Sequence, residues 1–144
     1  MGKGLVAIVV TVVMLTGAAW AAGQKGQSLY ERLGGKDAIT AVVETFVANV
    51  GKDKRINGFF ASTDLAKLKR HLVDQICEAS GGPCTYTGRT MKQTHAGMGI
   101  SNADFNALVE DLVAALDHHQ VGKAEKEELL GVLGPMRSDI VEKK

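Results

Sequence analysis

The chain has 144 residues, of which 45% are hydrophobic and 23% charged, as expected for one ordinary globular domain. Its 17 basic and 16 acidic side chains nearly balance. Electrostatics therefore gives no reason to expect nucleic acid or an acidic lipid surface as a partner.

The amino end has the three-part layout of a secretory signal. A positive charge at Lys3 precedes an apolar run over residues 5–15, and Ala19-Trp20-Ala21 supplies the small residues that a signal peptidase requires. We expect cleavage after Ala21, removal of residues 1–21, export to the periplasm or a similar compartment, and no membrane contact afterwards. The alternative is an uncleaved anchor, because the largely apolar residues 5–22 reach the lower length limit for spanning a bilayer.

Residues 22–27 form a short linker, and residues 28–144 are predicted to be one helical domain. A first helical turn is expected at residues 29–33, where Gly34-Gly35 ends it. Over residues 37–51 apolar side chains recur every three or four positions, which predicts a helix although many of them are β-branched. The members of this stripe are Ile39, Val42, Val43, Phe46, Val47 and Val50.

Asp64 is a good N-cap for a further helix, which Gly81-Gly82-Pro83 ends. The residues of this helix expected to face inward are Leu65, Leu68, Leu72 and Ile76. A helix of one or two turns is expected at residues 91–95.

Ser101-Asn102-Ala103-Asp104 has the layout of a capping box and opens a long helix. Its apolar stripe consists of Phe105, Leu108, Val109, Leu112, Val113 and Leu116. A last helix, with a solvated start at residues 123–128, is expected to be kinked at Pro135. Its apolar residues are Leu129, Leu130, Leu133, Met136 and Ile140. No strand pattern or internal repeat is visible, so the predicted fold class is all-α with one domain.

Cys77 and Cys84 flank the Gly-Gly-Pro turn. In an oxidising compartment such a turn can bring two Cα atoms within disulfide range. A disulfide is marginally favoured over two free thiols, and a metal site is disfavoured because no C-x-x-C spacing is present.

The run of residues 81–100 holds a single histidine, His95, in a short amphipathic segment between glycine-rich breaks. Nothing in the run is typical of a nucleophile, a phosphate loop or a carboxylate pair. Neutral imidazole is a strong ligand for iron, copper and zinc, so His95 is interpreted as an axial metal ligand. The alternative is an ordinary packed or surface histidine.

Four motifs, in order, resemble the group I truncated haemoglobins over residues 28–141. They are Leu29-Tyr30-Glu31-Arg32-Leu33-Gly34-Gly35, the pair Phe59-Phe60, Gly81-Gly82-Pro83 with Tyr86-Thr87-Gly88-Arg89, and Met91-x-x-x-His95-x-Gly97-x-Gly99-Ile100. The resemblance implies a two-over-two helical sandwich around one non-covalent haem b. The absence of a C-x-x-C-H motif agrees with non-covalent binding. We expect a monomer.

The resemblance also implies roles for single residues. His95 would be the proximal ligand through Nε2, Phe60 the aromatic residue packed on the porphyrin, and Leu68 a distal residue. The other expected haem contacts are Phe46, Val47, Leu72 and Met91. Core packing is the alternative role for Phe60 and Met91.

Two positions depart from the family pattern. The family usually has tyrosine where this chain has Val47, and commonly glutamine where it has Leu72. Those side chains donate hydrogen bonds to a bound gas, each worth about 1.5–3 kcal/mol when the acceptor is charged. Their loss weakens the case for tight oxygen binding and for the nitric-oxide dioxygenation that accompanies it in some relatives.

One polar candidate remains on the distal side. His71 follows Leu68 by three residues, and in some cyanobacterial members of the family a histidine at the matching position coordinates the iron. We therefore expect a bis-histidine iron, with His95 on one side and His71 on the other. The alternative is that His71 points to solvent or pairs with a haem propionate.

The expected function is reversible binding of a diatomic gas (oxygen, nitric oxide or carbon monoxide) at the haem iron. One alternative is a bis-histidine redox protein that exchanges electrons with a partner protein. Another is a haem enzyme that detoxifies nitric oxide or peroxide, for which no distal acid–base pair is present beyond His71.

Overall fold

The structure, a computed structural model, describes residues 26–144, so the expected signal segment (residues 1–21) and most of the linker (residues 22–27) lie outside the described residues. Within residues 26–144 the fold is all-α, as predicted, and the one β-type contact is an isolated bridge between Ser101 and Lys143. In this part of the chain no helix combines the length and the apolar character that crossing a bilayer requires.

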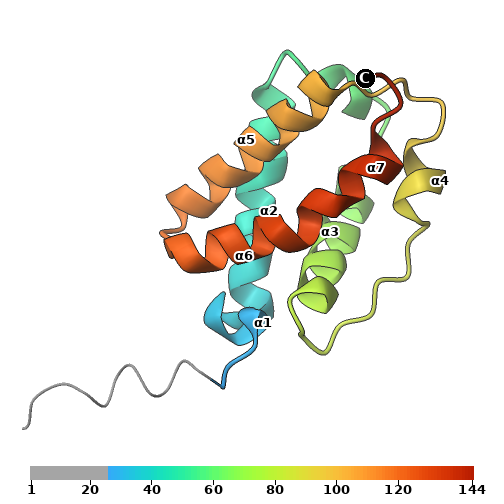
Figure 1. Cartoon of the computed structure of the whole chain (residues 1–144). Helices are drawn as coiled ribbons and strands as arrows, with labels where there is room; N and C mark the ends of the chain where they lie inside the picture. The colour runs from blue at the N-terminus through green and yellow to red at the C-terminus, as the bar shows by residue number, and fades with distance from the viewer. Residues whose placement is uncertain (1–25) are drawn as a thin grey trace, which may run out of the picture.

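Helices and 3-10 turns account for the regular structure of the described residues (Figure 1). They are α1 (Leu29–Arg32), α2 (Gly35–Lys52), η1 (Asn57–Phe60), α3 (Leu65–Ala79), α4 (Met91–His95), α5 (Asn102–His118), α6 (Lys123–Leu133), η2 (Gly134–Met136) and α7 (Arg137–Ile140). Four of them begin at a side-chain N-cap, formed by Ser28, Asp64, Thr90 or Ser101. Each cap contributes about 1 kcal/mol, and the predicted starts of these helices lie close to the observed ones.

The helices form the predicted two-over-two arrangement. Helix α2 packs against both α3 and α5, and α1 packs against α2 and α6. Figure 1 shows α5 and α6 running across α2, with the short helix α4 beside α7. The largest fully buried side chains come from four different helices and are Val43, Cys77, Leu116 and Leu129.

The buried face of α3 differs from the predicted one. Of the residues expected to face inward, Ile76 is buried, whereas Leu65 is 46% exposed and Leu68 and Leu72 are half-buried. The buried residues of α3 are Val73, Ile76 and Cys77. All three leucines line a cavity, and Leu72 also packs against the core. Periodicity alone does not distinguish a residue at a cavity wall from one in a helix contact.

The predicted disulfide is confirmed, and the last helix is interrupted at the predicted position. Cys77 and Cys84 are joined, with their Cα atoms 5.7 Å apart. Because Cys77 belongs to α3 and Cys84 to the segment before α4, the disulfide ties that segment to α3. At Pro135 the last helix changes to the 3-10 turn η2, as expected from the missing N–H of proline.

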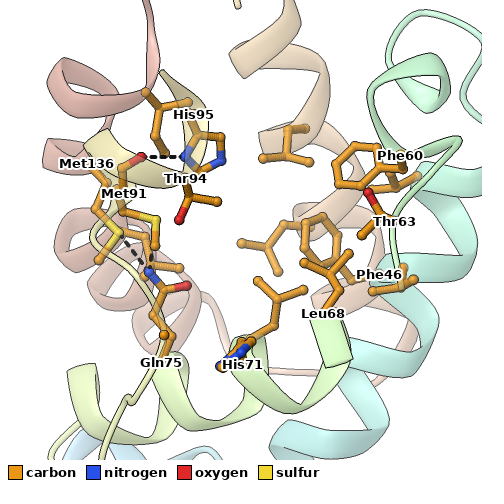
Figure 2. A pocket seen from close by; sticks show the side chains of 18 of the residues that line it. Phe46, Phe60, Thr63, Leu68, His71, Gln75, Met91, Thr94, His95 and Met136 are labelled. Atoms are coloured by element: carbon orange, nitrogen blue, oxygen red, sulfur yellow. Dashed lines mark hydrogen bonds between the residues drawn. The ribbon is translucent and has the colours of Figure 1, made fainter. Parts of the chain in front are cut away.

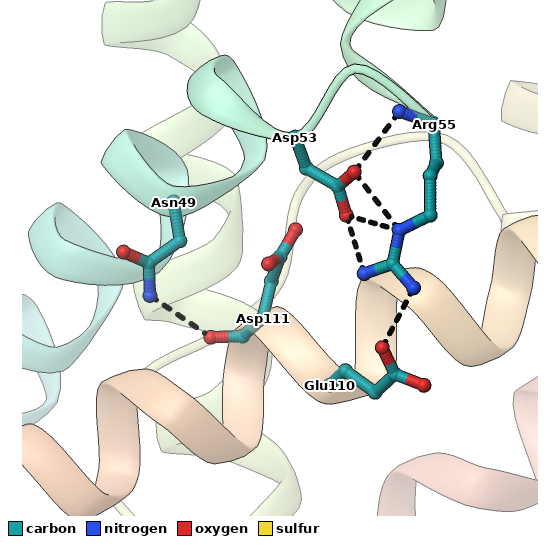
Figure 3. A network of polar contacts seen from close by, with 5 residues as sticks. All are labelled: Asn49, Asp53, Arg55, Glu110 and Asp111. Atoms are coloured by element: carbon teal, nitrogen blue, oxygen red, sulfur yellow. Dashed lines mark hydrogen bonds and ion pairs between the residues drawn. The ribbon is translucent and has the colours of Figure 1, made fainter.

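A polar network joins the end of α2 to α5 (Figure 3). The Arg55 guanidinium lies 2.8 Å from both Asp53 Oδ2 and Glu110 Oε2, and this contact lowers the pKa of Asp53. Asp111 lies beside Asp53, and its Oδ2 is buried with no hydrogen-bond partner within the described residues. Burial, followed by the charge of Asp53, raises the pKa of the Asp111 carboxyl.

Candidate functional site

A cavity of about 1100 Å³ lies between α2, α3, α4, α5 and the C-terminal helices. This volume is at the upper end of the range for ligand pockets, and the lining is mostly apolar. All the residues that the sequence predicts for the site line this one cavity, although they come from four separate elements. They are Phe46, Val47, Phe60, Leu68, His71, Leu72, Met91 and His95.

His95 is the last residue of α4, a helix that begins with a capping box between Thr90 and Gln93. Its Nδ1 lies 2.7 Å from the backbone oxygen of Met91, and the ring points into the cavity (Figure 2). A carbonyl oxygen can only accept, so Nδ1 must donate the hydrogen. This leaves Nε2 unprotonated, which is the state in which imidazole binds a metal.

The loop after His95 is tied to the carboxyl end of the chain. Gly97 and Gly99 both have positive φ angles (+80° and +65°), a conformation that glycine adopts without strain. Their backbone N–H groups donate to the two carboxylate oxygens of Glu142, over 2.7 and 2.6 Å. These two hydrogen bonds lower the pKa of Glu142 and hold α4 next to α7.

On the wall opposite His95, four apolar side chains lie near His71. Phe46 and Val47 of α2 are each 6% exposed, and Leu68 and Leu72 of α3 are half-buried at the cavity. None of these four side chains has a hydrogen-bond donor. A gas in this part of the cavity would therefore meet hydrocarbon unless His71 turned toward it.

Polar residues that the sequence analysis did not assign to the site also line the cavity. The Gln75 amide nitrogen lies 3.3 Å from Met91 Sδ and 3.4 Å from Met136 Sδ, which links α3 to the helix that carries His95 (Figure 2). Tyr86 lines the cavity beside His71. Gln75 could have been found from its spacing, four residues after His71 on the same face of α3. Tyr86 belongs to the motif of residues 86–89 named above, but the sequence gives no sign that its ring reaches His71.

Positive charge is present at the edge of the cavity. Lys67 and Arg89 line it and are solvent-exposed, so they are able to meet anionic groups of a ligand. Lys69, by contrast, forms an ion pair with Glu44.

The donor set at the site fits a metal held within a macrocycle. Among residues 26–144 no three His, Cys, Asp or Glu side chains gather to hold a metal ion, whereas one free imidazole nitrogen faces a large apolar cavity. A porphyrin would occupy the apolar space and supply the remaining nitrogen ligands to iron. The site therefore has the properties of a haem pocket.

Comparisons with known proteins agree with this class. Residues 28–142 match the family described as bacterial-like globin. Group 1 truncated hemoglobin GlbN of Mycolicibacterium paratuberculosis is 38% identical over 113 residues, which are 78% of this chain and 83% of that protein. The Synechocystis protein of the same name is 36% identical over 111 residues, 74% of this chain and 90% of that one.

Solved structures show the same fold. Truncated hemoglobin from Tetrahymena pyriformis, in its Fe(III) form, has a TM-score of 0.78 at 35% identity, with 81% of this chain and 100% of that chain covered. The 2/2 hemoglobin from Synechococcus, crystallised in the cyanomet state with covalently attached heme, has a TM-score of 0.76 at 35% identity and the same coverage. The chain belongs to the bacterial-like globins, as a group 1 truncated haemoglobin with one non-covalently bound haem.

Proposed function

We propose that this globin binds a diatomic gas reversibly at its haem iron, with His95 as the proximal ligand and His71 as an exchangeable sixth ligand. The observation that carries this proposal is the free Nε2 of His95, which faces the cavity, with His71 on the cavity edge across from it (Figure 2). When bound, the haem supplies the iron for which a gas and the His71 imidazole compete. Oxygen, nitric oxide and carbon monoxide are the candidate gases.

The residues around the two histidines would hold the haem and exclude water. Phe46, Phe60 and Met91 line the cavity with apolar surface that can pack on the porphyrin. Lys67 and Arg89, at the exposed edge, offer positive charge to the propionates. The Nδ1–H of His95, donated to Met91, fixes the tautomer and the orientation of the ring.

The distal wall favours a weakly polar gas. Val47 and Leu72 offer no hydrogen bond to a ligand that carries partial negative charge. Each missing donor lowers the affinity for such a ligand by about 1.5–3 kcal/mol. Oxygen is therefore expected to dissociate faster than from relatives that have the tyrosine and the glutamine, and carbon monoxide to be less affected.

His71 would set how often the sixth position is open. If the imidazole occupies that position for most of the time, the apparent affinity for gas equals the intrinsic affinity multiplied by the fraction of time that the site is free. The distal residue that controls gas binding would then be this histidine, in place of the tyrosine and glutamine.

Absorption spectra of the haem-loaded protein, ferric and ferrous, test the assignment of both histidines. We expect low-spin six-coordinate bands in the wild type and high-spin bands in His71→Leu. A wild type that is already high-spin, and unchanged in His71→Leu, would contradict the role of His71. Ferrous bis-histidine bands that saturating carbon monoxide fails to replace would instead favour a redox protein that transfers electrons to a partner.

The proximal assignment has its own test. His95→Gly should lose the wild-type spectrum, and added imidazole should restore it by occupying the space of the lost side chain. The matched control is His118→Gly, because His118 is exposed at the end of α5 and does not line the cavity. An unchanged spectrum in His95→Gly would show that another group binds the iron.

A further inference from the structure

The His71 ring contacts a tyrosine from another part of the chain. Its centroid lies 5.7 Å from that of Tyr86, and the two planes meet at 72°, an edge-to-face arrangement. Both residues are half-buried, and both line the cavity. Figure 2 shows His71 at the edge of the cavity, on the α3 side, whereas His95 extends into it.

Tyr86 is held in one orientation by its own loop. Its hydroxyl donates to the backbone oxygen of Arg89 over 2.7 Å. Its ring also lies over Gly88, because a Cβ atom on Gly88 would come within 2.3 Å of the tyrosine Oη. Glycine at position 88 therefore leaves the space that the ring occupies.

The disulfide joins the two segments that carry these rings. Cys77 follows His71 by six residues in α3, and Cys84 precedes Tyr86 by two residues. Cys77 is fully buried, so one end of the bridge is anchored in the core. The segment around Tyr86 is thus held next to the helix face from which His71 projects.

We propose that Tyr86 is a positioning residue that receives the His71 ring when His71 is not on the iron. This inference rests on the proposed role of His71 as an exchangeable sixth ligand. A ring packed on Tyr86 lies at the cavity edge, whereas a ligand at the sixth position must point to the middle of the cavity. Tyr86 therefore stabilises the open state, and the disulfide keeps Tyr86 in place.

The size of the effect follows from the contact. An edge-to-face aromatic pair contributes enough to change a two-state ratio by about 2- to 10-fold. Loss of the Tyr86 ring should therefore raise the ratio of iron-bound to displaced His71 by this factor. Gas binding should become slower by the same factor, because the open fraction falls.

The experiment uses the full haem-loaded protein and two readouts. After flash photolysis of the carbon monoxide complex, the ratio of molecules recaptured by His71 to molecules that rebind carbon monoxide is measured from the absorption spectrum. In the undisturbed carbon monoxide complex, nuclear Overhauser contacts between the rings of His71 and Tyr86 report whether the displaced ring rests on the tyrosine. The second readout does not depend on gas-binding activity.

Four variants distinguish the effect of the Tyr86 ring from that of the segment that holds it. Tyr86→Leu, which lacks the ring, and Gly88→Ala, which displaces it, should both increase recapture by His71 by about 2- to 10-fold. Tyr86→Phe keeps the ring but loses the bond to Arg89, and should increase recapture by less than Tyr86→Leu does. The double variant Cys77→Ser, Cys84→Ser should act in the same direction as Tyr86→Leu and add little to it. Thermal melting of each variant checks that it is folded.

The outcomes distinguish this inference from the function on which it rests. If His71→Leu changes the wild-type spectrum but Tyr86→Leu and Gly88→Ala leave recapture unchanged, Tyr86 has no positioning role and the assignment of His71 stands. The absence of ring–ring contacts in the carbon monoxide complex would also overturn the inference. If His71→Leu leaves the spectrum unchanged, His71 is not a ligand and both proposals fail.

Discussion

Replacement of Leu72 by glutamine tests whether the apolar distal wall determines how this globin holds oxygen. Leu72 lines the cavity from α3, directly after His71. Glutamine has a volume close to that of leucine and adds an N–H donor. A hydrogen bond to a partially charged ligand contributes about 1.5–3 kcal/mol. Leu72→Gln should therefore slow oxygen dissociation by about 10- to 150-fold.

The assay is oxygen dissociation by rapid mixing with excess carbon monoxide. It is best carried out in a His71→Leu background, so that the imidazole does not compete for the iron. Leu72→Met is the matched control, because methionine fills a similar space without a donor. Carbon monoxide dissociation, which depends less on a hydrogen bond, should change little. An oxygen dissociation rate in Leu72→Gln within twofold of that in Leu72→Met would refute the reasoning.

Three further predictions follow from other parts of the chain. Asp111→Asn should raise the free energy of unfolding at pH 7 by about 1 kcal/mol, because an amide can donate to Asp53 where the buried Oδ2 of Asp111 has no partner within residues 26–144. Folding raises the pKa of Asp111, so its destabilising effect is present above the folded-state pKa and vanishes below the unfolded-state value of about 4. Denaturant titrations on both sides of this window measure the effect, and an equal difference at both pH values would contradict it. Glu142→Gln leaves one acceptor oxygen for the two N–H groups of Gly97 and Gly99, and so weakens the contact that holds α4 and His95 in place. Haem transfer to apomyoglobin should therefore be faster than in the wild type and in the exposed control Glu127→Gln. If the protein is exported as we propose, amino-terminal sequencing of the mature chain should begin at Ala22, whereas a start at Met1 would exclude cleavage.

The disulfide supports the proposal of export independently of the amino-terminal segment. Bridges between cysteines persist in oxidising compartments and are rare in a reducing cytosol. The bond between Cys77 and Cys84 lies far along the chain from residues 1–21. It is therefore a separate line of support from the signal-like pattern of those residues. We therefore propose a compartment outside the cytosol.

Much of the fold could be predicted from local chemistry. The glycine-rich breaks and the amphipathic pattern, all within a few residues of His95, predict helix α4 at its observed residues. The 3-10 turn at Pro135 is likewise a local consequence of the missing N–H. The exposed Leu65 could not be predicted, because an apolar stripe has the same spacing whether it faces a helix or a ligand cavity.

The parts of the site that the sequence did not predict depend on contacts between distant segments. Tyr86 reaches His71 because a disulfide and a turn bring its segment back to α3. Gln75 meets Met136 only once the last helices fold across the cavity. Neither contact leaves a periodic signal, because each depends on where two separate elements end in space.

Contacts with other segments explain how so short a helix can present the proposed proximal ligand. Helix α4 has five residues, too few to be stable alone, because helix nucleation is unfavourable and each further residue adds one hydrogen bond. Its orientation therefore depends on the Thr90 capping box, on Gln75 through Met91, and on Glu142 through the loop after His95. On the opposite wall the disulfide holds the segment that carries Tyr86 next to α3. The positions of both histidines are thus determined largely by groups that never touch the iron, and substitutions at Glu142 or Tyr86 should change ligand binding without removing any ligand.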